Sequence, residues 1–172
     1  RLADSFAPAL ILSYGIGRLG CHFSGDGDWG IIANMSKKPD YLPDWLWGYN
    51  FPHNVIEAGV KINDCIGKYC YELPHPVYPT SLYEALFGIF AFVFLWSIRK
   101  KIKIPGILFC IYLILNGLER YSIEIIRVTE KYQILNTQLT QAQLIGILLI
   151  SIGFFGLIFL TKRNRQYEFI KK

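Results

Sequence analysis

Three stretches of this sequence hold residues whose types and spacing could do chemistry, and the first is rich in glycine. Residues 15–30 read G-I-G-R-L-G-C-H-F-S-G-D-G-D-W-G, with six glycines, one arginine and two aspartates. Glycine lets the backbone turn tightly or approach a ligand closely, and Arg18 keeps its charge even at a membrane boundary. The stretch therefore suits a polar site, although a glycine cluster alone more often marks only a turn.

A second set of polar residues lies in the later part of an apolar segment and just beyond it. Its members follow one another at spacings of four, four and three residues, and they are Asn116, Arg120, Glu124 and Arg127. This spacing places them on one face of a helix. Each charge inside a membrane helix costs about 2.5 to 3.5 kcal/mol on insertion scales, so such charges tend to pair and to line a site. The simpler alternative is an Arg120–Glu124 ion pair that anchors the helix end at the membrane interface.

The third stretch, residues 78–84, reads Y-P-T-S-L-Y-E. Ser81 and Glu84 have the spacing of a helix capping box, and Tyr83 has the character of an aromatic residue at a membrane interface. The stretch thus has a complete structural explanation and by itself would not indicate a site.

The remaining motifs indicate little further chemistry. Asp26 and Asp28 are spaced as in a calcium loop but lack the further acids of an EF-hand, and we expect no metal. No GxSxG elbow, Walker loop or HExxH is present, so hydrolase and nucleotide-binding functions have no motif behind them.

The cysteines leave several alternatives open. Cys65 and Cys70 could form a disulfide in an oxidising compartment, stay free, or bind zinc together with His75; the disulfide is favoured because a fourth zinc ligand is lacking. Cys110 lies in an apolar segment and is interpreted as a small apolar filler.

Composition indicates a membrane protein. Of the 172 residues, 52% are hydrophobic, and the mean hydropathy is +0.29, which is high for a soluble protein. The net charge of +5 does not indicate nucleic-acid binding, because the basic residues gather at the ends of apolar blocks, in residues 99–103 and 162–172. That distribution is typical of the cytoplasmic flanks of membrane segments.

Four apolar segments set the predicted fold, and they span residues 6–16, 82–98, 104–126 and 139–160. The first is shorter than the roughly 20 residues that a bilayer requires, so it is the end of a longer helix or a re-entrant piece. Pro105 suits a first helical turn, and Thr140 with Gln143 forms a capping box before the fourth segment. The sequence predicts an all-α, polytopic integral membrane protein with a long external loop, in a single membrane domain covering residues 1–172.

The basic flanks also predict the topology. If residues 99–103 and the chain after residue 160 are cytoplasmic, the loops at about 18–80 and 127–138 lie outside. The charged residues of the first two stretches then meet at one membrane face, where we expect Arg18, Asp26, Arg120, Glu124 and Arg127. Arginines there suit a lipid phosphate, whose oxygens accept bidentate bonds, and an adjacent carboxylate could take a proton. The residues alone therefore predict a site for an anionic phospholipid.

These stretches resemble one known family. G-R-L-G-C-H-F-S-G-D, at residues 17–26, resembles the G-R-x-G-N-F-x-N-G-E pattern of the prolipoprotein diacylglyceryl transferases. Y-P-T-S-L-Y-E resembles their H-P-S-Q-L-Y-E or H-P-T-Q-L-Y-E, and R-Y-S-I-E-I-I-R, at residues 120–127, resembles their R-x-x-x-E-x-x-R. The three stretches occur in the family's order and extend over nearly the whole chain.

The resemblance implies a multi-pass enzyme of the bacterial inner membrane, with its site on the periplasmic side and no cofactor. Such enzymes transfer the diacylglyceryl group of phosphatidylglycerol to the lipobox cysteine thiol of a prolipoprotein signal peptide and release glycerol phosphate. Arg18 and Arg120 would hold the phosphate, Glu124 would fix Arg120, and Asp26 would replace the family's glutamate in the catalytic set. The implied substrate-binding residues are Gly17, Gly25, Tyr83, Glu84, Asn116 and Arg127.

The chain also departs from the family patterns, at Cys21, Ser24, Tyr78, Ser81 and Asn116. It begins at Arg1 within an apolar run, so we expect the carboxy-terminal portion of a larger transferase, without the family's amino-terminal helices. The alternative function is a catalytically silent phospholipid-binding or membrane assembly protein of the same fold.

Overall fold

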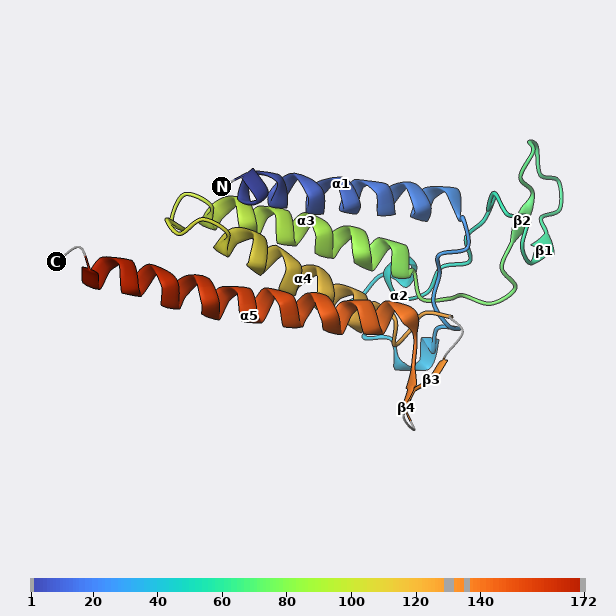
Figure 1. Cartoon of the computed structure of the whole chain (residues 1–172). Helices are drawn as coiled ribbons and strands as arrows, with labels where there is room; N and C mark the ends of the chain where they lie inside the picture. The colour runs from blue at the N-terminus through green and yellow to red at the C-terminus, as the bar shows by residue number, and fades with distance from the viewer. Residues whose placement is uncertain (1, 129–131, 135–136, 171–172) are drawn as a thin grey trace.

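Four long helices form the body of the protein. The computed structural model describes residues 2–128, 132–134 and 137–170. The long helices are α1 (Leu2–Ser24), α3 (Thr80–Ile98), α4 (Ile107–Ile123) and α5 (Gln141–Ile170). They lie side by side as a bundle, with both ends of the chain and the α3–α4 connection at one end and the longer connections at the other (Figure 1).

The short elements lie at that second end of the bundle. They are a 3₁₀ turn (Met35–Lys37), α2 (Asp44–Trp47), β1 (Val60–Lys61), β2 (Tyr71–Glu72), β3 (Tyr132–Ile134) and β4 (Thr137–Leu139). β1 pairs antiparallel with β2, and β3 with β4, as two separate hairpins. The structure is therefore mostly helical, as the sequence predicts, with two small strand pairs that it did not.

Among the residues that the structure describes, two helices have the length and composition to cross a membrane, namely α3 and the part of α5 from Gln141 to Gln166. The window in α5 is only 11% buried inside the protein, as expected for a helix that exposes its apolar side chains to lipid. α4 has 17 residues, near the lower limit for a spanning helix. The number of spans and the single domain stay predictions.

The predicted start of the external loop was wrong, because α1 continues to Ser24. Polar residues after Ile16 do not end the helix, since its last turn is held by packing. The ring of His22 is buried, with its centroid 5.3 Å from that of Tyr49 and 5.4 Å from that of Phe51. The chain leaves the helix only at Gly25, whose φ of +61° favours glycine.

Other predicted boundaries shifted as well. The N-cap of α3 is Pro79, with no side-chain cap, so the predicted Ser81–Glu84 capping box was wrong and both side chains are buried inside the bundle. α4 begins after Gly106 rather than at Pro105. The capping box before α5 is confirmed: the Gln143 N–H donates to Thr140 Oγ1 at 3.2 Å, and the Thr140 N–H donates to Gln143 Oε1 at 3.1 Å.

Small residues let the helices approach closely in two pairs. A Cβ added at Gly88 of α3 would lie 2.9 Å from the Cα of Gly15 on α1, and one added at Gly117 of α4 would lie 2.6 Å from the carbonyl oxygen of Gly146 on α5. Cys110 is buried where a Cβ on Gly156 would meet its Sγ at 2.7 Å, which agrees with its interpretation as a filler. Such small-residue contacts are a common way for membrane helices to pack.

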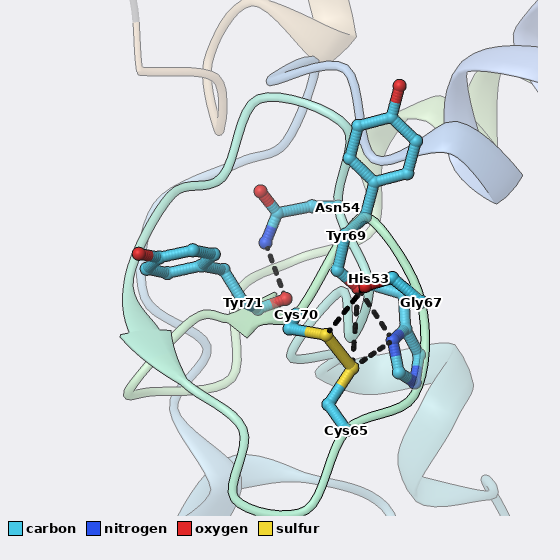
Figure 2. Close-up of a disulfide and its surroundings, with 7 residues drawn as sticks. All are labelled: His53, Asn54, Cys65, Gly67, Tyr69, Cys70 and Tyr71. Atoms are coloured by element: carbon cyan, nitrogen blue, oxygen red, sulfur yellow. Dashed lines mark hydrogen bonds between the residues drawn. A yellow bond between two sulfur atoms is a disulfide. The ribbon is translucent and has the colours of Figure 1, made fainter.

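The long loop between α1 and α3 is organised by a buried amide and a disulfide (Figure 2). Asn54 is fully buried; its Nδ2 donates to the Tyr71 carbonyl at 3.0 Å, and its Oδ1 accepts the Ala58 N–H at 2.7 Å. Cys65 and Cys70 form a disulfide. The favoured alternative is thus confirmed in the structure, and the proposed zinc site is excluded there because both sulfur atoms are bonded to each other.

We predict that Gly117→Ala destabilises the protein, because the new methyl group meets the backbone of α5. The expected loss is about 1 to 3 kcal/mol, as for other overpacked positions. Gly17→Ala is the matched control on α1, since a Cβ there meets nothing within 4 Å and alanine favours a helix by up to about 1 kcal/mol. Unfolding of the detergent-solubilised protein by sodium dodecyl sulfate measures both; equal losses would contradict the close α4–α5 contact.

We also predict that alkylation followed by mass spectrometry separates the four cysteines into two classes. Under denaturing conditions without reductant, only Cys21 and Cys110 should be labelled, because these two are free. After reduction Cys65 and Cys70 should be labelled too. Labelling of all four without reductant would contradict the disulfide, and a chelator that changed the pattern would favour metal binding.

Candidate functional site

Two arginines and two acids form a compact group at the loop end of the bundle, which we name the ion-pair cluster: Arg18, Asp28, Glu84 and Arg127. Arg18 pairs through Nη1 with Asp28 and through Nε with Glu84 Oε2, the latter at 3.1 Å. Arg127 Nη2 lies 2.7 Å from Asp28 Oδ1 and 3.8 Å from Glu84 Oε2. Each acid thus contacts both arginines, and the four formal charges cancel.

Backbone pairing brings these four residues together from distant parts of the sequence. The Gly30 N–H donates to the Tyr78 carbonyl at 2.9 Å, and the Ile31 N–H donates to the Ile126 carbonyl at 2.8 Å. The segment that follows α1 therefore lies between the segment before α3 and the segment after α4. A Cβ on Gly30 would lie 2.7 Å from the Ile126 oxygen, so this close approach requires glycine.

Two residues that the sequence reasoning missed lie next to the cluster, inside the bundle. The Tyr14 hydroxyl is 3.2 Å from Glu84 Oε1 and 2.9 Å from Glu119 Oε1. Glu119 is only 3% exposed. A signal for both existed: Tyr14 lies one helical turn before Arg18, and an acid inside an apolar segment requires a polar partner.

A cavity of about 640 Å³ opens beside the cluster. Its wall comes from the segment after α1, the end of α4 and the first residues of α5, and is formed by Gly27, Asp28, Trp29, Arg120, Glu124, Arg127, Val128, Gln141, Ala142 and Ile145. Two arginines, Arg120 and Arg127, and two acids, Asp28 and Glu124, line this space, and the amino-terminal end of α5 adds partial positive charge.

Arg120 and Glu124 have the fewest ion pairs and hydrogen bonds among the charged groups that line the cavity. The predicted Arg120–Glu124 ion pair is not formed, and Arg120 makes no ion pair with any residue that the structure describes. Glu124 is 4% exposed, and its Oε1 has no hydrogen-bond partner among the described residues. Arg120 can therefore bind a molecule in the cavity without breaking an ion pair, whereas Glu124 Oε1 is enclosed.

The structure separates the predicted residues into those that meet and those that do not. Arg18, Glu84 and Arg127 meet in the cluster, whereas Arg120, Glu124 and Arg127 line the cavity. The cavity wall lacks the other predicted residues, which are Gly17, Gly25, Asp26, Tyr83 and Asn116.

Two of the predicted residues that the cavity wall lacks, Asp26 and Tyr83, make contacts elsewhere in the protein. Asp26 is exposed and accepts the Asp28 N–H at 3.3 Å, so Asp28, not Asp26, contacts the arginines. Tyr83 donates its hydroxyl to the Leu46 carbonyl at 2.7 Å and so fastens α2 to α3.

The geometry does not favour a metal at this site. Cys21, Asp26 and Asp28 place possible ligand atoms within 4.8 Å of one another. However, Asp28 is already paired with two arginines, and their positive charge opposes the binding of a cation.

Comparison with known proteins identifies the family. The sequence profile of the prolipoprotein diacylglyceryl transferases matches residues 1–159. The chain belongs to this family. The match includes α1, α3, α4 and most of α5, and therefore every residue of the ion-pair cluster and of the cavity wall.

Individual relatives agree with this assignment. The chain is 32% identical over 166 residues to a phosphatidylglycerol–prolipoprotein diacylglyceryl transferase of Staphylococcus xylosus, a match that covers 96% of this chain and 51% of the relative. It is 31% identical over 168 residues to one from Clostridium perfringens, covering 95% of this chain and 54% of the relative. The chain thus spans about half the length of the curated transferases it matches. No solved structure matches it.

We predict that Asp28→Asn destabilises the protein more than Asp26→Asn does. The first change removes an anion shared by two arginines, and we expect a loss of about 1 to 2 kcal/mol, since Asp28 is partly exposed. The second removes an exposed carboxylate without an arginine contact and should change stability by less than about 0.5 kcal/mol. Thermal unfolding in detergent measures both variants, and the reverse order would contradict the placement of Asp28 in the cluster.

Proposed function

We propose that this chain is the carboxy-terminal part of a phosphatidylglycerol–prolipoprotein diacylglyceryl transferase. The protein crosses the bacterial inner membrane several times, and its site faces the periplasm. Figure 1 supports this orientation, because the α3–α4 connection and the end of α5, where the basic residues gather, lie at the end of the bundle opposite the long loop. Positive flanks of this kind are typical of the cytoplasmic side.

The cavity carries the proposal, because Arg120, which makes no ion pair with the described residues, lines it within the part of the chain that the family profile matches. Arg120 is free to bind a lipid phosphate through its guanidinium group, and Arg127 lines the same wall. The apolar exterior of α5 would place the acyl chains of phosphatidylglycerol in the surrounding bilayer. The other substrate is the signal peptide of a prolipoprotein.

The reaction requires a thiol proton to leave and a carbon–oxygen bond to break. The cysteine sulfur of the lipobox attacks the glyceryl carbon that carries the phosphate ester, a carbon–sulfur bond forms, and glycerol phosphate departs. Arg120 and Arg127 stabilise the negative charge that grows on the departing phosphate. In this proposal Glu124, which lines the cavity, takes the thiol proton, since the thiolate is the nucleophile.

Arg18 has a different role in this proposal from the one that the resemblance implies. Its Nη1 and Nε contact Asp28 and Glu84, and it does not line the cavity. It therefore acts through Asp28, which shares the wall with Arg127. Asp26, which the resemblance places in the catalytic set, has no such contact.

The alternative is a catalytically silent protein that binds a phospholipid without turnover. One observation favours it: Arg127, one of the two arginines in the cavity wall, is already paired with Asp28. A single uncommitted arginine suffices for binding but gives less stabilisation of a departing phosphate.

We predict that Arg120→Ala abolishes transfer. Membrane vesicles that contain the full-length protein are incubated with phosphatidylglycerol and a lipobox peptide, and the diacylglyceryl thioether is measured by mass spectrometry. Loss of one preorganised donor should lower the rate by about a hundredfold or more, whereas Lys101→Ala, in the α3–α4 connection, should leave it unchanged.

Two other outcomes would decide against the enzyme. If wild type and Arg120→Ala gave the same product yield, the assigned role of the cavity would be wrong. If wild type bound phosphatidylglycerol vesicles through Arg120 but formed no thioether, the silent binding protein would be the better description.

A further inference from the structure

The two carboxyl contacts of the Tyr14 hydroxyl require one hydrogen more than the hydroxyl itself carries. The hydroxyl oxygen lies at hydrogen-bond distance from two carboxyl oxygens, Glu84 Oε1 at 3.2 Å and Glu119 Oε1 at 2.9 Å. A tyrosine hydroxyl carries one hydrogen and can donate only one bond. The other contact is attractive only if the carboxyl group itself carries a hydrogen that it donates to the tyrosine oxygen.

The surrounding charges indicate which acid carries that hydrogen. Glu84 Oε2 is 3.1 Å from Arg18 Nε and 3.8 Å from Arg127 Nη2, so its anion is stabilised. Glu119 makes no ion pair with any described residue, and its Oε2 is buried without a hydrogen-bond partner. A buried carboxylate without a cation is strongly disfavoured, whereas a buried neutral acid is tolerated.

The groups that face Glu119 from the neighbouring helices agree with this assignment. They are Tyr14 and Arg18 from α1, Glu84 from α3 and, on its own helix, Arg120. Arg18 is occupied by Asp28 and Glu84, and Arg120 lines the cavity. Because the charges of the ion-pair cluster already cancel, an ionised Glu119 would add an uncompensated negative charge.

We propose that Glu119 is a protonated positioning residue: its carboxyl O–H donates to Tyr14, Tyr14 donates to Glu84, and Glu84 holds Arg18. This chain of contacts connects α4, α1 and α3 and ends at the cluster beside the cavity. Neither Tyr14 nor Glu119 belongs to the motifs that carry the family resemblance. The protonation of Glu119 does not depend on what the protein catalyses. Only the expected effects on transfer activity rest on the proposed transferase function.

Infrared spectroscopy tests the proton directly. The full-length protein in lipid nanodiscs, labelled with ¹³C-glutamate, should show at neutral pH a carbonyl band of a protonated carboxylic acid that the label shifts. The band should disappear in Glu119→Gln and persist in Glu84→Gln. A labelled wild-type protein without such a band would overturn the proposal, even if the variants failed to fold, and so would a band that disappears in Glu84→Gln but not in Glu119→Gln.

Activity provides a second, separate readout. Glutamine can still donate a hydrogen bond to Tyr14, so Glu119→Gln should keep the transfer rate within about twofold of wild type. Glu119→Ala and Tyr14→Phe remove this hydrogen bond and should lower the rate by roughly tenfold. If Glu119→Gln were as impaired as Glu119→Ala, a carboxylate would be required and the proposal would be wrong. If the wild type showed no transfer at all, the proposed function would fail, but the infrared result would still decide the protonation of Glu119.

Discussion

The ion-pair cluster is the interaction on which the arrangement of the site depends. Burying an ion costs several kcal/mol, and attraction to its partners offsets this only when those partners are in place. Glu84 is 2% exposed as a residue, so its charge is tolerated only because Arg18 and Arg127 contact it. The cluster thus ties α1 and the segment after it to α3 and to the segment after α4. The backbone pairs of Gly30 and Ile31 join the segment after α1 to the residues just before α3 and just after α4.

Helix packing supplies the rigid base for this cluster. Gly15 and Gly88 bring α1 against α3, and Gly117 and Gly146 bring α4 against α5. At the opposite end of the bundle, both carboxylate oxygens of Asp4 accept backbone N–H groups at the start of α4, from Gly106 at 2.6 Å and Phe109 at 2.9 Å. The unsatisfied donors of a helix start are thereby paired, and α1 and α4 are fixed to each other. Arg18 and Glu119 consequently come from helices whose separation is fixed at a distance from the site.

Hydropathy predicted the helices well, because the apolar blocks are long, but it could not predict how polar residues extend or shorten them. Residues 18–24 continue α1 because His22 packs among aromatic rings of the loop, a contact between positions far apart in sequence. The same limit applies to the site. Helical spacing brought Arg120, Glu124 and Arg127 together correctly. The choice between Asp26 and Asp28 depends on two glycines with positive φ that turn the chain, Gly25 before Asp26 and Gly27 between the two acids. Ser81 and Glu84 fitted a local capping pattern, but partners from α1 bind them both.

The three arginines of the site differ in the acids that they contact. Arg18 contacts two acids and is enclosed by them, Arg127 contacts the same two acids from the cavity side, and Arg120 contacts none of the described ones. An anion entering the cavity therefore meets Arg120 first, without breaking an existing ion pair, and can compete with Asp28 for Arg127 only at a cost. Because Arg18 contacts both Asp28 and Glu84, each acid keeps one arginine contact if Arg127 turns toward the anion. Arg127 can then contribute to binding a ligand without leaving the buried carboxylate of Glu84 alone, because Arg18 remains beside it.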